Sequence, residues 1–224
     1  MAATCSLSTK VWVSAILVVI IIASLTGISY TTSNAALKET AQWGLESTAG
    51  VMATQINASE IQDLKPGDEL SPKYLAVATK LQTMRSMNDQ ILNAYILKVN
   101  PDQTVTFVVD DLYPVDPQGS AKIGEISTAP DKMDILAALS GPTAAKKPYT
   151  TRYGSFMTAY APIDDSLTGS GGNTYAVLAI DVSAKDYIDS TTKGGWIIVT
   201  GIVSIILALG AIIVSARKAE GKKE

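Results

Sequence analysis

The chain has 224 residues, of which 47% are hydrophobic, and a formal net charge of −3. This length allows one ordinary domain with attachments. The sequence has no histidine and one cysteine, Cys5, which excludes imidazole-based triads, histidine-ligated zinc or haem, and a disulfide within the chain. We expect no nucleic-acid partner.

Two charge-free apolar runs, residues 11–30 and 196–216, lie near the two ends of the chain. Each is long enough to cross the roughly 30 Å hydrocarbon core of a bilayer as a helix. We therefore predict two transmembrane helices and contact with a lipid bilayer. The first run could instead be a signal peptide cleaved after Ser33-Asn34-Ala35. It is longer than the usual apolar region of a signal peptide, which favours an uncleaved anchor.

Basic residues outside the two runs predict the orientation. They lie before the first run, at Lys10, and after the second, at Arg217, Lys218, Lys222 and Lys223. Basic flanks mark the cytoplasmic side, so we expect the N-terminus (1–10) and the tail (217–224) to be cytoplasmic. Residues 31–190 then form an acidic domain outside the plasma membrane, and Cys5 lies inside.

The first element of this domain is a helix that continues from the first span. Apolar or small residues recur on one face of it, at Leu37, Ala41, Leu45, Thr48, Met52 and Ile56. This spacing predicts a helix that serves as a stalk, and its face could associate with a second copy. After a break at residues 64–72, Ser71 can cap a second helix and Pro72 can start it. Its predicted apolar face carries Leu75, Ala78, Leu81 and Met84.

Strand-like segments follow. Residues 91–99 and 104–110 are joined by the turn Asn100-Pro-Asp-Gln103, and a short helix is predicted at 131–140. Three further strands are expected at 147–152, 155–163 and 174–182, with the Gly/Ser-rich segment 164–173 as a loop. Two helices, two strands, one helix and three strands predict an antiparallel sheet with helices packed on it, an α+β domain.

This order, and the wording of several blocks, resembles the single-Cache (PAS-like) family of extracytoplasmic sensor domains. The blocks are LKPGDELSPKYLAVATKLQTMR, AYILKVNPDQTVTFVVDD, IGE, KKPYTTRYGSFMTAYAPIDD and YAVLAIDVSA. The resemblance covers residues 37–190. It implies a Cache fold with a long N-terminal helix and an antiparallel sheet of about five strands, here between two transmembrane helices.

Tyrosines and charged residues gather on the predicted strands and at their ends. Tyrosine offers an apolar face and one hydroxyl, whereas Asp and Arg bind polar groups of a ligand. Alternation places Asp181 on the strand face opposite Ile180 and Val182, among small residues, so that a ligand or a helix N-terminus could fill the space. Alternatively, Asp181 caps a helix or pairs with Arg152. The candidate ligand-binding residues are Tyr95, Asp110, Tyr149, Arg152, Tyr153, Tyr160 and Asp181, with Tyr113 nearby.

The resemblance assigns roles to two of these residues. In Cache domains that bind amines or amino acids, an Asp at the position of Asp181 binds the ligand ammonium, and a Tyr matches Tyr149. Two departures speak against an amino acid. Thr150 and Thr151 follow Tyr149 where the family has Tyr-x-Asp, and the block Tyr-x4-Arg-x2-Trp that would bind a carboxylate is missing. A small organic acid, another small metabolite or no ligand stay open.

Catalysis is not expected. The acid pairs Asp110-Asp111 and Asp164-Asp165 could act as acid and base, but adjacent acids at strand ends and in turns are typical of solvated loops. We expect no enzyme activity, cofactor or metal. Asn57-Ala58-Ser59 is an acceptor pattern for N-glycosylation, a triplet that also arises by chance.

The predicted function is a membrane-anchored extracytoplasmic module that senses a small molecule. Because only a short basic tail follows the second span, the signal is expected to pass to a separate membrane signalling protein. Small residues in the second span favour a homo-oligomer, namely Gly201, Ser204, Ala208 and Ala211. The alternative is a structural membrane protein whose Cache-like domain self-assembles into an oligomer or filament.

Overall fold

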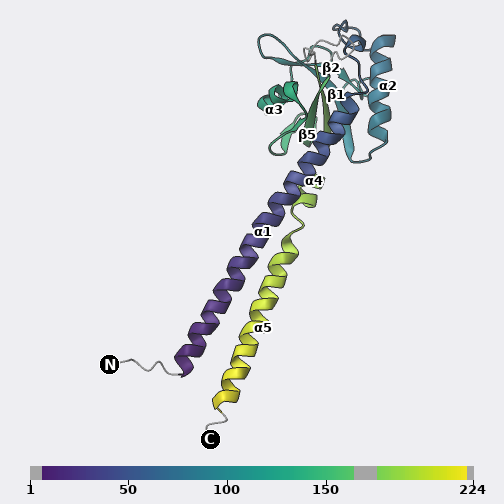
Figure 1. Ribbon diagram of the computed structural model, residues 1–224. Coiled ribbons are helices and arrows are strands. Elements are labelled where there is room, and N and C mark those ends of the chain that lie inside the picture. The colour runs from purple at the N-terminus through teal and green to yellow at the C-terminus, as the bar shows by residue number, and fades with distance from the viewer. Residues whose placement is uncertain (1–6, 164–175, 221–224) are drawn as a thin grey trace. The chain divides into compact units, whose positions relative to one another are not determined.

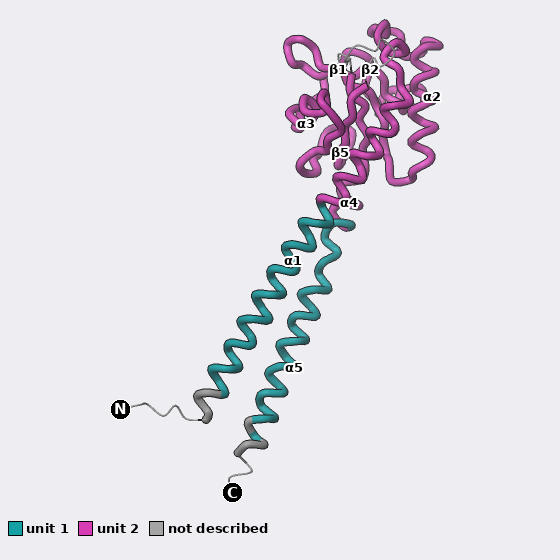
Figure 2. Tube along the Cα trace, viewed as in Figure 1, with its two compact units in different colours: residues 1–38, 190–224 teal, residues 39–189 magenta. Residues whose placement is uncertain are grey.

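The computed structural model describes residues 7–163 and 176–220. It divides into two compact units, residues 39–189 and residues 1–38 with 190–224 (Figure 2). The long helix α1 (Leu7–Ala53) begins in the second of these units, and its last turns belong to the first.

Residues 39–189 contain an antiparallel sheet (Figure 1). Five of its strands follow the order β2-β1-β6-β5-β3, and β4 pairs with β5 outside this path. The strands are β1 (Ile91–Val99), β2 (Val105–Asp110), β3 (Thr143–Ala144), β4 (Tyr149–Thr151), β5 (Gly154–Ile163) and β6 (Ala176–Ser183). The predicted α+β class, with a long N-terminal helix and an antiparallel sheet, is confirmed.

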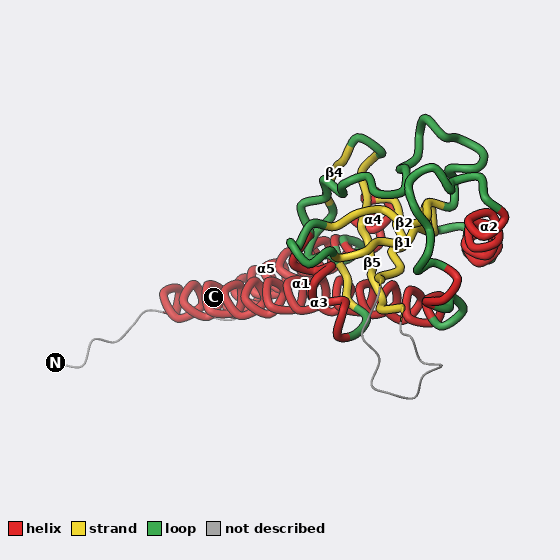
Figure 3. The backbone as a smooth tube through the Cα atoms, turned by 90° about the horizontal axis from the view of Figure 1, so that it is seen from above, coloured by secondary structure: helices red, strands yellow, loops and turns green. Residues whose placement is uncertain are grey.

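Each face of the sheet buries its own apolar cluster, because side chains alternate along each strand. On one face Ile96, Met157 and Ile180 pack with residues of α1 and of α2 (Pro72–Ser86). On the other face Tyr95, Tyr160 and Ala179 pack with residues of α3 (Lys132–Ala137) and the short helix η2 (Ala138–Ser140). Figure 1 shows α2 and α3 on opposite sides of the strands, and Figure 3 shows α2 nearly end-on beside them.

The apolar stripe of α1 packs inward. Ala49 and Met52 are buried in the same cluster as Ile96, and Leu45 packs against it. At Ala41, Leu45 and Met52 the structure therefore corrects the prediction that this stripe is a face for a second copy, because these side chains pack in the domain core. Ile56 is also buried there, but it lies beyond the end of the helix at Ala53. The side chain of Trp43 is 70% exposed and that of Val51 67%.

Helix α2 begins as predicted. Ser71 is its N-cap, its hydroxyl accepts a hydrogen bond from the Tyr74 N–H, and Pro72 is the first helical residue. The buried face differs from the prediction, because Leu75 and Met84 are only half-buried. The buried residues are Tyr74, Val77, Ala78 and Leu81. Tyr74 can be buried because its hydroxyl forms hydrogen bonds with the backbone of Asp110.

Several short elements escaped prediction. The strand β3 and the short helix η1 (Ala58–Glu60) have only two or three residues, too few to show a period. Helix α4 (Ala184–Thr191) follows β6 directly. The strand expected at 147–152 is shorter, as β4. The loop 164–173, Asp164 and Asp165, and the expected first residue of the last strand, Thr174, lie outside the described residues.

The other unit contains the first part of α1 and helix α5 (Gly195–Glu220). Two helical segments, Val11–Ala53 and Ala184–Ser215, have the length and the apolar composition needed to cross a membrane. Gly201 on α5 lies so close to Thr26 on α1 that an added Cβ would be 2.4 Å from the Thr26 hydroxyl. This small residue thus serves packing within one chain. Cys5, Lys222 and Lys223 lie outside the described residues.

Candidate functional site

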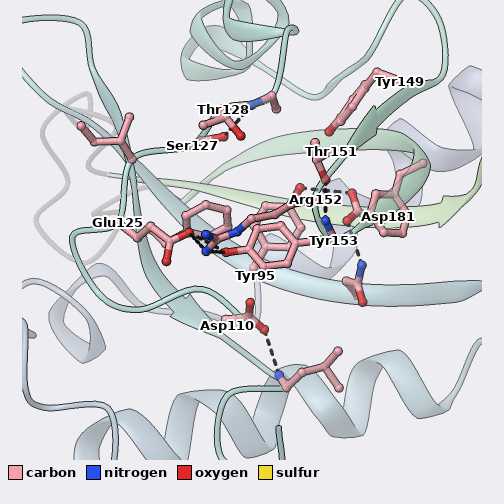
Figure 4. A pocket seen from close by; sticks show the side chains of 16 residues that line it. Tyr95, Asp110, Glu125, Ser127, Thr128, Tyr149, Thr151, Arg152, Tyr153 and Asp181 are labelled. Carbon is pink, nitrogen blue, oxygen red and sulfur yellow. Dashed lines mark hydrogen bonds and ion pairs between the residues drawn. The ribbon is translucent and has the colours of Figure 1, made fainter. Parts of the chain in front are cut away.

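A cavity of about 310 Å³ lies in residues 39–189, on the face of the sheet that α3 covers (Figure 4). Its lining comes from β1, β2, the segment between β2 and α3, the β4–β5 hairpin and β6. The lining residues are Asn93, Tyr95, Phe107, Asp110, Leu112, Glu125, Ile126, Ser127, Thr128, Ala129, Tyr149, Thr151, Arg152, Tyr153, Phe156 and Asp181.

Strand register places a carboxylate at the floor of the cavity. Asp181 on β6 is the partner of Asn93 on β1 and of Thr158 on β5, so the three form one rung across the sheet. Asp181 Oδ1 accepts hydrogen bonds from the Thr158 hydroxyl at 2.6 Å and the Tyr95 hydroxyl at 3.1 Å. Asp181 Oδ2 accepts one from Asn93 Nδ2 at 3.0 Å. The protein therefore holds this side chain in a single orientation.

Asp181 is only 3% exposed. Burial raises its pKa to about 6, and the hydrogen bonds from Thr158, Asn93 and Tyr95 oppose that rise. The side chain is therefore mostly ionised at pH 7. A carboxylate has about four acceptor positions, and three are occupied, so Oδ2 retains one for a donor on a ligand.

A second layer of hydroxyls lies behind this floor. The Tyr149 hydroxyl is 2.7 Å from the Thr158 hydroxyl and 3.2 Å from that of Tyr160. The Tyr160 hydroxyl donates to Asp131 Oδ2. Asp131 is buried, and burial raises its pKa. A continuous chain of polar contacts thus connects Asp181 at the cavity with Asp131 at the start of α3.

A charged cluster occupies another part of the wall. Arg152 Nη2 is 2.5 Å from Glu125 Oε1, and the Tyr153 hydroxyl also donates to Glu125 at 2.5 Å. The Arg152 guanidinium lies over the Tyr153 ring, 4.6 Å from its centroid. The sequence had suggested Asp181 as a partner for Arg152. The structure corrects this, because the partner is Glu125 and Asp181 is bonded by neutral side chains.

Asp110 holds a loop as well as lining the cavity. Its Oδ1 accepts from the Leu112 N–H at 3.0 Å and its Oδ2 from the Ala121 N–H at 2.9 Å. Burial raises its pKa to about 6, opposed by these two bonds. Because both oxygens accept backbone donors, Asp110 fixes the segment after β2 around the cavity.

The structure brings most of the predicted site residues together. Tyr95, Asp110, Tyr149, Arg152, Tyr153 and Asp181 all line the cavity. Tyr160 is not part of the lining, and its hydroxyl is 3.2 Å from that of Tyr149, which is. Tyr113 packs edge-on against Tyr74 on the other face.

Sequence reasoning missed Asn93, Glu125, Thr158 and Asp131. Asn93 had a usable signal, an amide inside an otherwise apolar strand, two residues before Tyr95 and on the same face. Glu125 and Asp131 lie outside the strands, and nothing local marks them.

The arrangement favours binding over catalysis. The cavity combines aromatic rings with a few oriented polar groups, which is typical of small-molecule sites. Among the described residues, no three His, Cys, Asp or Glu side chains are grouped so as to hold a metal ion.

Comparisons with known proteins give structural likenesses only. No protein-family model matches the sequence, and no curated protein matches it. One similar structure is the ligand-binding domain of the Campylobacter jejuni chemoreceptor Tlp3 in complex with L-norvaline, with a TM-score of 0.38 and 15% identity over 76% of this chain and 64% of that one. Another is the periplasmic domain of RsbU from Chlamydia trachomatis, with a TM-score of 0.35 and 12% identity over 73% of this chain and 58% of that one.

A second structure of the Tlp3 sensory domain, with isoleucine bound, has a TM-score of 0.34 and 16% identity over 72% of this chain and 67% of that one. The chain therefore spans about three fifths to two thirds of the length of these structures. The two Tlp3 structures are described as a ligand-binding domain and a sensory domain, and the RsbU structure as a periplasmic domain.

Proposed function

We propose that this protein is a membrane-anchored sensor module whose extracytoplasmic domain, residues 31–190, binds a small molecule that presents a cationic or hydrogen-bond-donating group to Asp181. The observation that carries the proposal is the state of Asp181. Its side chain is fully oriented by three donors from its own domain, is mostly ionised at pH 7 and still lines a cavity. A buried carboxylate costs stability unless it is compensated, so its presence favours a binding role.

The charges of the cavity wall support a cation. Three carboxylates, those of Asp110, Glu125 and Asp181, line the cavity with one guanidinium, that of Arg152. Glu125 already neutralises Arg152 at 2.5 Å, so a ligand carboxylate would find no free positive charge on these residues. The rings of Tyr95, Phe107 and Tyr153 add faces that attract cations.

The strand that carries Asp181 is connected along the sequence to the second predicted membrane span. Strand β6, which carries Asp181, ends at Ser183, and α4 begins at the next residue, Ala184. The apolar helix α5 follows from Gly195. A change at Asp181 therefore acts on the segment that leads into the second predicted span, and the signal would pass to a separate membrane protein.

The test is a ligand screen on the purified full chain in detergent, with small primary amines, amino acids and small carboxylates as probes and the melting temperature as readout. We expect an amine to stabilise the wild type, by about 2.7 kcal/mol at 100 times its dissociation constant, and not Asp181→Asn. Asp63→Asn, an exposed acid outside the cavity, serves as the control and should respond like the wild type. A carboxylate hit that Asp181→Asn retains would contradict the assignment.

A structural, self-assembling protein is the second candidate. The observation that favours it is the exposed side of α1, where Trp43 and Val51 are apolar and face away from the domain core. With Ser47 between them, these positions recur every four residues, which places them on one helix face. Cysteines at Ser47 and Val51 should then crosslink between copies in membranes, whereas a cysteine at the core-facing Ala49 should not. Equal crosslinking at all three positions would remove this support.

A further inference from the structure

The chain of contacts between the buried acids Asp131 and Asp181 has more contacts than hydroxyl protons to fill them. It contains four oxygen–oxygen contacts: Asp131 to Tyr160, Tyr160 to Tyr149, Tyr149 to Thr158, and Thr158 to Asp181. The three hydroxyl groups supply one proton each. If both acids are ionised, Tyr160 donates to Asp131 and Thr158 donates to Asp181. The single proton of Tyr149 then serves one of its two contacts, and the other joins two oxygens with no proton between them.

We infer that the chain holds a fourth proton and that Asp131 carries it. The Asp131 carboxyl then donates to Tyr160, Tyr160 donates to Tyr149, Tyr149 donates to Thr158, and Thr158 donates to Asp181. All four contacts become hydrogen bonds that run in one direction, an arrangement in which each bond polarises the next.

Asp131 is a poorer place for negative charge than Asp181. Three side chains of the protein donate to Asp181. Asp131 Oδ2 accepts from Tyr160, and the buried Oδ1 of Asp131 has no hydrogen-bond partner among the described residues. An ionised carboxylate with a bare buried oxygen is costly, whereas a neutral carboxyl group leaves a carbonyl oxygen there at much lower cost.

The groups around Asp131 point the same way. From the sheet these are Tyr95 on β1, Tyr149 on β4, Tyr160 on β5 and Asp181 on β6, and from its own helix Asp134. None of these five is a cation, and two are acids. The neighbouring cation on the same helix, Lys132, is exposed. The desolvation that raises the pKa of Asp131 is consistent with this.

The inference concerns the same site as the proposed function. Its consequence for ligand binding rests on that function, whereas the position of the proton does not. With Asp131 protonated, every proton of the chain points towards Asp181. Tyr149, which lines the cavity, then presents its remaining lone pair to a ligand. Loss of the proton from Asp131 would turn the Tyr160 hydroxyl back towards Asp131 and remove the hydrogen bond that Tyr149 accepts from it. The hydroxyl of Tyr149 at the cavity would then have different partners, so binding would be linked to pH through a group that the ligand does not touch.

Infrared spectroscopy of the ligand-free full chain, in a detergent without ester groups, tests the inference. Protonated carboxyl groups have a carbonyl band separate from the bands of carboxylates. We expect this band to persist in the wild type above pH 7, where Asp110 and Asp181, whose pKa values are about 6, are mostly ionised. It should be lost in Asp131→Asn and remain in Asp181→Asn.

Tyr149→Phe tests the proton count without altering an acid. It removes one proton and two contacts, so that two hydroxyl protons serve two contacts and no fourth proton is required. The band should therefore titrate at lower pH in Tyr149→Phe, and Tyr153→Phe, a cavity tyrosine outside the chain, should behave like the wild type.

Three results would overturn the inference. A wild type without the band above pH 7 would show that the chain has three protons. Loss of the band in Asp181→Asn but not in Asp131→Asn would place the proton at the cavity. A Tyr149→Phe variant that titrates like the wild type would show that burial alone holds the proton. Because no ligand is used, failure of the ligand screen leaves this test unaffected.

Discussion

Asn93 on β1 donates from its Nδ2 to Asp181 Oδ2 on β6 at 3.0 Å, and the two residues are register partners. An amide opposite an acid can rotate to present its oxygen instead. In Asp181→Asn, the new Oδ1 can still accept from Tyr95 and Thr158, and Asn93 can turn to accept from the new Nδ2. We therefore expect this variant to be as stable as the wild type at pH 7, or more stable.

Asp181→Ala should behave differently. It leaves the donors of Asn93, Tyr95 and Thr158 without an acceptor, which costs about 1–3 kcal/mol per unsatisfied group. Chemical denaturation of the full chain in detergent measures both variants. Equal destabilisation by Asn and by Ala would show that the negative charge, and not the hydrogen-bond geometry, holds the rung together.

Stability should also depend on pH through Asp181. Its pKa in the folded chain is about 6 against an ordinary value of 3.8, so the folded state binds the proton more tightly than the unfolded state. The resulting stability is fully present below pH 4 and is lost as the pH rises through 6. A shift of this size corresponds to about 3 kcal/mol. Asp181→Asn should lose that part of the slope and retain the part due to Asp110, whose pKa is also about 6. An unchanged slope would contradict the raised pKa.

Two ion pairs of equal length should differ in their contribution to stability. Arg85 Nε is 2.5 Å from Asp111 Oδ2, and the Asp111 side chain is fully buried. Arg152 is 2.5 Å from Glu125, but its side chain is 63% exposed. Removing one partner of a buried pair strands a charge, so Asp111→Ala should cost about 3–5 kcal/mol. Glu125→Ala should cost less than about 1 kcal/mol. Denaturant midpoints compare them, and similar losses would refute the distinction.

The hairpin that carries Arg152 and Tyr153 requires glycine at its turn. Gly154 has a φ of +142°, and an added Cβ would lie 2.6 Å from the end of the Phe156 ring. Gly154→Ala should therefore destabilise the domain by about 1–3 kcal/mol. Gly141→Ala is the control, because nothing lies within 4 Å of its added Cβ. Thermal melting separates the two, and a Gly154→Ala variant as stable as the control would show that Phe156 moves away freely.

The orientation in the membrane is a further prediction. The basic residues after the second apolar run predict cytoplasmic termini and an outer domain. A cysteine at the exposed Gln118 should react with a membrane-impermeant thiol reagent in intact cells, whereas native Cys5 should react only after lysis. Labelling of Cys5 but not of the introduced cysteine in intact cells would reverse the orientation.

Local patterns were sufficient for much of the fold. Charge-free runs long enough for a membrane span can be recognised without tertiary contacts, because burying a charge in a bilayer is costly. Alternation placed Asp181 on the face of β6 opposite Ile180 and Val182, and in the structure these two residues belong to the cluster on the other side of the sheet. The alternating pattern also predicted the strand that carries Tyr95. In the structure this strand, β1, pairs directly with β6, which carries Asp181.

The site itself depended on register and packing, which a single strand cannot reveal. Nothing in the sequence pairs Asp181 with Asn93 and Thr158, since their contact requires β6 to lie between β1 and β5. The partner of Arg152 comes from a segment 27 residues earlier in the chain, and many acids were possible partners. The stripe of α1 was recognised from its period, but period shows only that a face is apolar. Whether that face meets a second copy or its own domain depends on which surface is available, and here the sheet and α2 cover it.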